Sequence, residues 1–292
     1  MNRRTFMAAA AVGGIATVSS SQAASRVVQA TAAQPDAGRA GKFRHSVCRW
    51  CFGGMSLEDL CKLASTIGYS SVELLGPDEW DVPKRHGMTC AVATNVKSNS
   101  IGKGFNRIEH HDAIIAELEE RLPLVAAAGI PQQIVFSGNR AGLGDREGLR
   151  NCAEGLKRIT PLAEKLGVTL VMELLNSRVD HKDYMCDRTP WGLELVKRVG
   201  SPRFKLLYDI YHMQIMEGDV IRTISDNMDA IAHFHTAGVP GRNELDDRQE
   251  LNYRGIAAAL AKSGFTGYLG QEFMPTGDAE AALRKAFEIC NV

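Results

Sequence analysis

Short apolar runs alternate with longer amphipathic segments from residue 42 to the end of the chain. A short apolar run bounded by turn residues is typical of a buried strand, and an apolar face that recurs every three to four residues is typical of a helix. The predicted strands are residues 43–48, 71–75, 89–94, 133–137, 169–174, 204–209, 231–235 and 268–272. The predicted helices are residues 56–67, 111–128, 146–166, 190–199, 218–227, 253–263 and 278–289.

This order predicts a single (β/α)8 barrel, the TIM barrel, over residues 42–292. Strands that alternate with helices form a parallel sheet, and eight of them favour closure into a barrel, which takes about 250 residues. The segment between the second and third strands, residues 77–86, has the weakest helical pattern. An open doubly wound sheet is the alternative, but no GxGxxG motif follows the first strand to support it.

The first residues have the composition of an export signal. Arg3 and Arg4 precede a short apolar run and then small residues up to Ala24. That order is typical of a signal peptide, and the run is too short to span a bilayer. The arginine pair predicts a twin-arginine signal over residues 1–24, which uses the twin-arginine export machinery and leads to a periplasmic protein. A disordered tail is the alternative, and residues 25–41 have the composition of a linker.

The charge and the cysteine content of the chain argue against two classes of function, nucleic-acid binding and redox chemistry. The chain has 34 Lys and Arg against 34 Asp and Glu and no dense basic run, so we expect no nucleic-acid partner. The seven cysteines are an odd number, and Cys48 and Cys51 form a lone CxxC. A disulfide between them is one interpretation, and two unrelated structural cysteines are another. Neither interpretation points to redox chemistry as the function.

Four consecutive predicted strands end in ionisable residues, which are Glu173, Asp209, His235 and Glu272. In a (β/α)8 barrel the carboxyl ends of the strands meet at one mouth, where catalytic groups lie. Each residue alone has a structural explanation, such as a capped carboxylate or a hydrogen-bonded core histidine. Three carboxylates at one mouth repel each other, however, and a divalent cation removes that repulsion.

These four residues therefore predict a metal site. Three carboxylate oxygens and one imidazole nitrogen suit Mn²⁺, Mg²⁺ or Co²⁺ better than a structural zinc ion, which favours thiolates and several histidines. With a cation polarising a carbonyl oxygen, Glu173 and Glu272 on opposite sides of a substrate can move a proton between neighbouring carbons through an enediolate.

Two further residues are expected to bind substrate oxygens. His212 lies just past the sixth strand, and Arg242 lies in the loop after the seventh. The guanidinium of an arginine suits a substrate carboxylate, because it donates two parallel hydrogen bonds. A solvated loop charge is the alternative for Arg242.

Several separated motifs resemble one known family. The segment YDIYHMQIMEGD at residues 208–219 is similar, almost residue for residue, to the sixth-strand segment of hydroxypyruvate isomerases, which are xylose-isomerase-like TIM barrels. Four further motifs follow in the family's order: ELLN at 173–176, VPGRNE at 239–244, ELNY at 250–253 and GYLGQEF at 267–273. The resemblance extends from about residue 43 to residue 274.

The resemblance implies a metal-assisted isomerase that interconverts hydroxypyruvate and 2-hydroxy-3-oxopropanoate. Glu173 and Glu272 are then the acid/base pair, and His212 and Asn176 lie near the substrate. His235 is a departure, since hydroxypyruvate isomerases often have glutamine there and related ketose 3-epimerases have histidine. A ketose 3-epimerase or other sugar isomerase is therefore an alternative, as is an exported barrel that binds a sugar or a metal without turnover. The expected partner is a small hydroxy-carbonyl compound or a sugar, and a homo-oligomer is left open.

Overall fold

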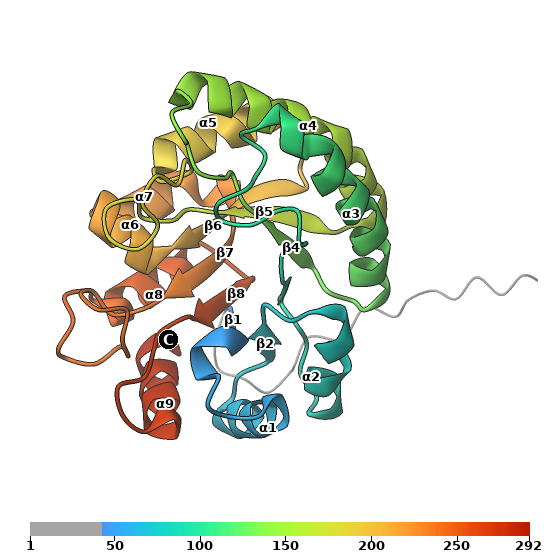
Figure 1. Ribbon diagram of the computed structural model, residues 1–292. Coiled ribbons are helices and arrows are strands. Elements are labelled where there is room, and N and C mark those ends of the chain that lie inside the picture. Colours follow the sequence, from blue (N-terminus) through green and yellow to red (C-terminus); the bar gives the residue numbers. More distant parts are fainter. Residues whose placement is uncertain (1–42) are drawn as a thin grey trace, which may run out of the picture. The chain divides into compact units, whose positions relative to one another are not determined.

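The computed structural model describes residues 43–292, which form a closed barrel of eight parallel strands (Figure 1). The strands are β1 (Arg44–Cys48), β2 (Ser71–Glu73), β3 (Val92–Ala93), β4 (Gln132–Val135), β5 (Thr169–Glu173), β6 (Phe204–Asp209), β7 (Ile231–Thr236) and β8 (Tyr268–Gln271). The predicted signal peptide and linker, residues 1–24 and 25–41, lie outside the described residues.

Hydrogen bonds join the strands in the order β2-β1-β8-β7-β6-β5-β4-β3, and each neighbouring pair is parallel. The two end strands also meet, because parallel bridges join Ser71 to Thr89 and Leu75 to Ala93. This contact closes the sheet on itself. The predicted (β/α)8 barrel is thereby confirmed, and the carboxyl ends of all eight strands face one mouth.

Helices surround the barrel and cover its outer face (Figure 1). They are α1 (Leu57–Ile67), α2 (Asp81–Arg85), α3 (Ile108–Ala127), α4 (Asp145–Leu166), α5 (Thr189–Val199), α6 (Ile210–Met216), α7 (Val220–Asn227), α8 (Tyr253–Lys262) and α9 (Ala279–Cys290). Short 3-10 helices are η1 (Arg49–Phe52), η2 (Pro77–Glu79) and η3 (Met228–Ala230). The hydroxyl of Ser56 accepts a hydrogen bond from the Asp59 N–H and caps α1. α4 and α5 end at Gly167 and Gly200, where the left-handed backbone favours glycine.

The structure differs from the predicted elements in two places near the mouth. β3 contains only Val92 and Ala93 in place of residues 89–94, because Thr89 pairs with β2 through a single bridge. The segment after Asp209 forms α6, a helix that the sequence did not predict. Most residues of α6 are buried, so it has no polar face from which a helical period can be read.

One continuous core of buried apolar side chains fills the barrel and the space between the sheet and the helices. All seven cysteines are buried and free, so Cys48 and Cys51 form no disulfide. Within residues 43–292, no helix combines the length and the apolar character that crossing a membrane requires.

Candidate active site

Glu173, Asp209, His235 and Glu272 meet at the mouth of the barrel, at or next to the ends of β5, β6, β7 and β8. One possible ligand atom from each residue lies within 4.8 Å of the other three. All four residues are buried, so their charges interact at low effective dielectric. The structure thus brings together the four residues that the sequence selected. Their oxygen-rich donor set fits a hard divalent cation.

His235 lies in the middle of this cluster. Its Nδ1 is 3.0 Å from Oε1 of Glu173 and 3.3 Å from Oε2 of Glu272. On the other edge of the ring, Nε2 is 2.8 Å from Oε1 of Glu73, the last residue of β2. Nε2 of His233 is 2.9 Å from the same Glu73 oxygen. A further buried carboxylate therefore lies directly behind the predicted metal ligands.

Two side chains hold the carboxylate of Glu272. Trp50 Nε1 donates a hydrogen bond of 2.9 Å to Oε1, and Arg242 donates one of 2.6 Å to Oε2. The Arg242 guanidinium is 5.0 Å from the centre of the Trp50 ring and 5.4 Å from that of Tyr211, both within the range of cation–π attraction. The Nε of Arg242 is buried and has no hydrogen-bond partner among the described residues. Arg242 therefore keeps a donor for a ligand.

Asp209 links the metal-ligand candidates to the helix that follows β6. Its Oδ1 accepts a hydrogen bond of 3.0 Å from the backbone N–H of His212 and so caps α6. Its Oδ2 lies 3.7 Å from Nε2 of His212 and 3.9 Å from Arg242. One oxygen of Asp209 thus fixes the start of α6, and the other faces the predicted substrate-binding residues.

His212 and Asn176 are buried side by side next to this cluster. Oδ1 of Asn176 accepts hydrogen bonds from the backbone of Val179 and Asp180, which identifies Nδ2 as the donor. That Nδ2 is 2.6 Å from Nδ1 of His212. Burial lowers the pKa of His212 well below its ordinary value, so the ring is neutral and carries its hydrogen on Nε2. This Nε2–H has no hydrogen-bond partner within residues 43–292.

Burial and neighbouring charges shift the pKa values of the cluster in opposite directions. Burial raises the pKa of Glu173 and of Asp209, and the charge of Glu272 raises both further. Burial also opposes the charge of Glu272, but His235 and Arg242 outweigh it and hold the Glu272 pKa well below its ordinary value. The two glutamates of the predicted acid/base pair therefore lie in unlike environments.

A pocket of about 400 Å³ opens beside the cluster. Its polar wall includes Glu173, Glu272, Arg242 and the half-exposed Trp50. Its apolar wall comes from the end of β2, the loop after β3, the end of β4 and the end of β5: Leu74, Ile101, Ile134, Phe136 and Leu175. The pocket has the size and the mixed lining of a small-molecule site.

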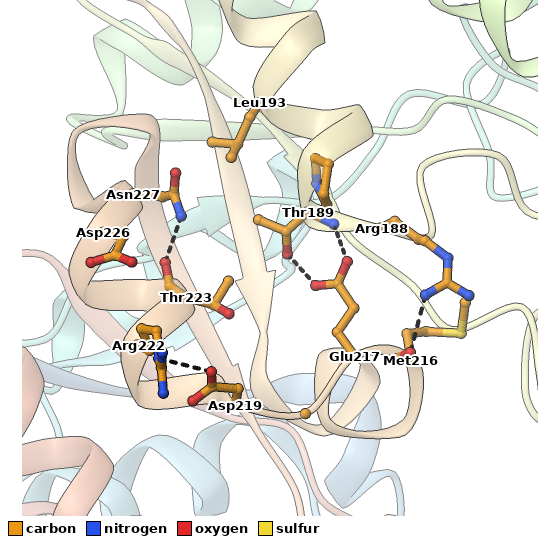
Figure 2. Close-up of a pocket in the computed structure, with 12 residues that line it drawn as sticks. Arg188, Thr189, Leu193, Met216, Glu217, Asp219, Arg222, Thr223, Asp226 and Asn227 are labelled. Carbon is orange, nitrogen blue, oxygen red and sulfur yellow. Dashed lines mark hydrogen bonds and ion pairs between the residues drawn. The ribbon is translucent and has the colours of Figure 1, made fainter.

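Another hollow, of about 470 Å³, lies between the ends of α5 and α7 (Figure 2). Four of its five charged side chains, Arg188, Glu217, Asp219 and Arg222, bind neighbouring groups. Glu217 accepts hydrogen bonds from both the backbone and the hydroxyl of Thr189, and Arg222 pairs with Asp219 (Figure 2). None of the predicted site residues lines this hollow. These contacts stabilise helix ends, so the pocket at the mouth is the candidate active site.

Sequence reasoning did not select Trp50 or Glu73. Trp50 lies inside the CxxC, a motif that is defined by its two cysteines. A single tryptophan between them follows no spacing rule that would indicate a function. Glu73 ends β2 as Glu173 ends β5, but the predicted second strand extends to residue 75 and places Glu73 in its middle, so the search for acids at strand ends does not select it.

Known isomerases are similar to this chain. A 2-oxo-tetronate isomerase from Pectobacterium atrosepticum is 28% identical over 239 residues, which are 77% of this chain and 89% of that protein. The hydroxypyruvate isomerase of Escherichia coli is 26% identical over 231 residues, which are 76% of this chain and 89% of that protein. These matches confirm the predicted enzyme class, an isomerase.

The fold has solved counterparts. The crystal structure of an AP endonuclease of family 2 from Brucella melitensis matches with a TM-score of 0.75 and 25% identity, and the match covers 86% of this chain and 100% of that one. The model of the xylose isomerase-like TIM barrels matches residues 61–291, which include all four predicted metal ligands. The chain therefore belongs to the family of xylose isomerase-like TIM barrels.

Proposed function

We propose that this protein is a metal-assisted isomerase that interconverts hydroxypyruvate and 2-hydroxy-3-oxopropanoate, or a similar small hydroxy-carbonyl compound. The observation that carries the proposal is the convergence of Glu173, Asp209, His235 and Glu272 beside a small-molecule pocket. The similarity to a hydroxypyruvate isomerase and a 2-oxo-tetronate isomerase supports the same chemistry.

The reaction needs one proton to leave a carbon and another to reach its neighbour. Glu173, Asp209, His235 and Glu272 would hold a divalent cation such as Mn²⁺, Mg²⁺ or Co²⁺, which would supply positive charge against the negative charge that develops on the substrate oxygens. Glu173 and Glu272 both line the pocket, so both can contact a bound substrate. In hydroxypyruvate, one glutamate removes a proton from C3 and the other delivers a proton to C2, while the proton of the C3 hydroxyl moves to the C2 oxygen. The ketone at C2 thereby becomes an alcohol, and the alcohol at C3 becomes an aldehyde.

Arg242 and His212 have free donors that suit substrate oxygens. Arg242 lines the pocket and retains an unpartnered Nε–H, which supports a role in binding the substrate carboxylate. The unpartnered Nε2–H of His212 supports a hydrogen bond to a hydroxyl or carbonyl oxygen. Asn176 acts on substrate binding indirectly. Its amide donates to Nδ1 of His212 and so fixes the ring hydrogen on Nε2, which faces the substrate in this proposal.

An NMR time course in D₂O tests this proposal. The purified protein is treated with Mn²⁺, exchanged into Mg²⁺ and given hydroxypyruvate, and an EDTA-stripped sample is the control. We expect deuterium exchange at C3 and growth of the aldehyde product only in the sample that contains metal. No exchange above the stripped control would remove hydroxypyruvate as the substrate.

The pocket also supports a second candidate, the 3-epimerisation of a free ketose. A volume of about 400 Å³ with an apolar wall is more than a three-carbon acid fills, and His235 matches the histidine of ketose 3-epimerases. A substrate panel separates the two: turnover of ketoses without turnover of hydroxypyruvate selects the epimerase. A barrel that only binds its ligand would show calorimetric binding and no turnover of either class.

We also propose that the chain is exported to the periplasm through the twin-arginine route. Arg3 and Arg4 support this, because an arginine pair ahead of a short apolar run is the pattern of a twin-arginine signal. The double variant Arg3→Lys and Arg4→Lys should stay in the cytoplasm. Unchanged periplasmic accumulation of that variant would contradict the proposed route.

A further inference from the structure

One carboxylate oxygen of Glu73, inside the barrel, contacts three other buried side chains. Its Oε1 lies 2.8 Å from Nε2 of His235 and 2.9 Å from Nε2 of His233, and the Cys48 thiol donates to it at 3.5 Å. All four side chains are fully buried. A carboxylate so far from water is tolerated only where donors surround it, so its position here is built by the fold.

Gly270 leaves the space through which Glu73 reaches His235. β2 and β7 are separated in the sheet by β1 and β8, so the two side chains meet across the barrel interior and not along one ladder. A Cβ added at Gly270 of β8 would lie 2.7 Å from Oε1 of Glu73 and 2.9 Å from Cδ2 of His235. Both distances are too short for real contacts. A side chain at this position would therefore push Glu73 and His235 apart.

Cys48, Glu73 and His235 are close enough together to suggest a second metal site. The hydrogen bonds argue against it. A carboxylate oxygen only accepts hydrogen bonds, so Nε2 of both His235 and His233 must carry a hydrogen to bind it. These two N–H donors satisfy the single carboxylate of Glu73 without a cation, whereas on the Nδ1 side of His235 three carboxylates lie together and repel each other. Cys48, Glu73 and His235 therefore do not form a second metal site. Glu73 instead supports the metal-ligand candidates through His235.

We propose that Glu73 is a positioning residue: it fixes the ring orientation and tautomer of His235 so that Nδ1 faces the metal centre. The inference rests on the proposed metal-assisted function. Nδ1 of His235 faces Glu173 and Glu272, and without a metal it shares a hydrogen with these carboxylates. A metal ion bound there would displace that hydrogen, and because Glu73 keeps the other hydrogen on Nε2, the Nδ1 lone pair would face the metal. Carboxylates that hold the second nitrogen of a metal-bound histidine act in this way, and their loss weakens metal binding about 10- to 100-fold.

Metal affinity of the stripped full-length protein tests the proposal. Mn²⁺ binding is measured by calorimetry for the wild type, Glu73→Gln and Gly270→Ala. Gly270→Ala keeps every charge and displaces Glu73, so it separates positioning from simple loss of a negative charge. The control is Glu217→Gln, which removes a hydrogen-bonded carboxylate at the start of α5, away from the cluster.

We expect Mn²⁺ affinity to fall about 10- to 100-fold in Glu73→Gln and in Gly270→Ala, with no change in Glu217→Gln. Wild-type affinity in Glu73→Gln would overturn the positioning role and leave the proposed function in place. A wild-type protein that binds neither Mn²⁺ nor Mg²⁺ would overturn the proposed function itself, and the positioning role with it.

A second measurement detects the ring hydrogens of His235 in the wild-type protein. Long-range ¹H–¹⁵N correlations of the histidine rings report which nitrogen carries the hydrogen, and the His235 signals are assigned by their absence from His235→Gln. We expect Nε2 of His235 to carry a hydrogen both before and after Mg²⁺ is added, with Nδ1 as the nitrogen whose shift changes. A change at Nε2, with the hydrogen on Nδ1, would overturn the proposal.

Discussion

Trp50 donates its indole N–H to Oε1 of Glu272 at 2.9 Å, and so joins η1, which follows the first strand, to the proposed acid/base pair. Arg242 holds the other oxygen of the same carboxylate. Glu272 therefore has no freedom to rotate away from the pocket unless one of these bonds breaks.

Replacing Trp50 by phenylalanine keeps an aromatic ring and removes this donor. A hydrogen bond to a charged group contributes about 1.5–3 kcal/mol, and 45% exposure of Trp50 places this one at the low end. We expect kcat/KM to fall about tenfold. The matched control is Trp191→Phe, which removes an indole bond to the Asp145 carbonyl on the outer surface. Equal kcat/KM values for the two variants would remove Trp50 from the site.

Glu272→Gln removes the proton-transfer group and keeps the shape of the side chain. Because general acid or base catalysis contributes about 10²- to 10⁴-fold, we expect turnover to fall by that factor. The control is Glu250→Gln, an exposed carboxylate that binds Gln214. Rates are measured with saturating Mn²⁺, and circular dichroism checks the fold. Near-wild-type rates in Glu272→Gln would exclude it from the acid/base pair.

The substitution Asp209→Asn separates the two roles of Asp209, which are the capping of α6 and the proposed binding of a metal ion. The asparagine oxygen still accepts the His212 N–H and caps α6, so the melting temperature of the metal-free protein should change little. The neutral amide is a poorer metal ligand than a carboxylate, so most of the metal should be lost on dialysis. Metal content is measured by atomic emission, with Asp219→Asn on the outer surface as the control. Wild-type metal content would refute the ligand role of Asp209.

His45 lies at the end of the barrel opposite to the candidate site, and its buried ring makes the stability of the barrel depend on pH. Its ring packs 5.2 Å from that of Phe43 and 4.8 Å from that of Phe287, and burial lowers its pKa to about 4. In the unfolded chain a histidine has a pKa of about 6.5. Between these values the unfolded chain binds a proton that the folded chain does not, so stability falls as the pH drops from about 6.5 to about 4, by at most about 3 kcal/mol.

His45→Phe should remove this loss. Urea unfolding at several pH values between about 4.5 and 7.5 gives the free energy of unfolding of both proteins. The wild type should lose more stability than His45→Phe on acidification, and the gap should widen as the pH falls. The same pH slope in both proteins would show that His45 is protonated in the folded state too.

The parts of this protein that depend on local pattern were predictable from its sequence. The period of apolar residues located the eight strands, and acids at strand ends located Glu173, Asp209 and Glu272, because the barrel places all strand ends together. The helix α6 was not predictable from periodicity, because it is buried on nearly all sides.

Contacts between segments that are far apart in the sequence could not be predicted either. The bond from Trp50 to Glu272 joins residues 222 positions apart, and the bond from His235 to Glu73 joins residues 162 positions apart. Neither pair shares a motif or a spacing rule. Which donors and acceptors meet inside the barrel depends on the width of the barrel and on gaps such as the one at Gly270, and these appear only in three dimensions.

The ionisable cluster and the apolar wall of the pocket come from different arcs of the barrel. Strands β5 to β8 carry the metal-ligand candidates, whereas most of the wall, including Leu74, Ile101 and Phe136, follows β2, β3 and β4. Substitutions in the wall can therefore change the size of compound that the pocket admits and leave the proposed proton-transfer residues in place.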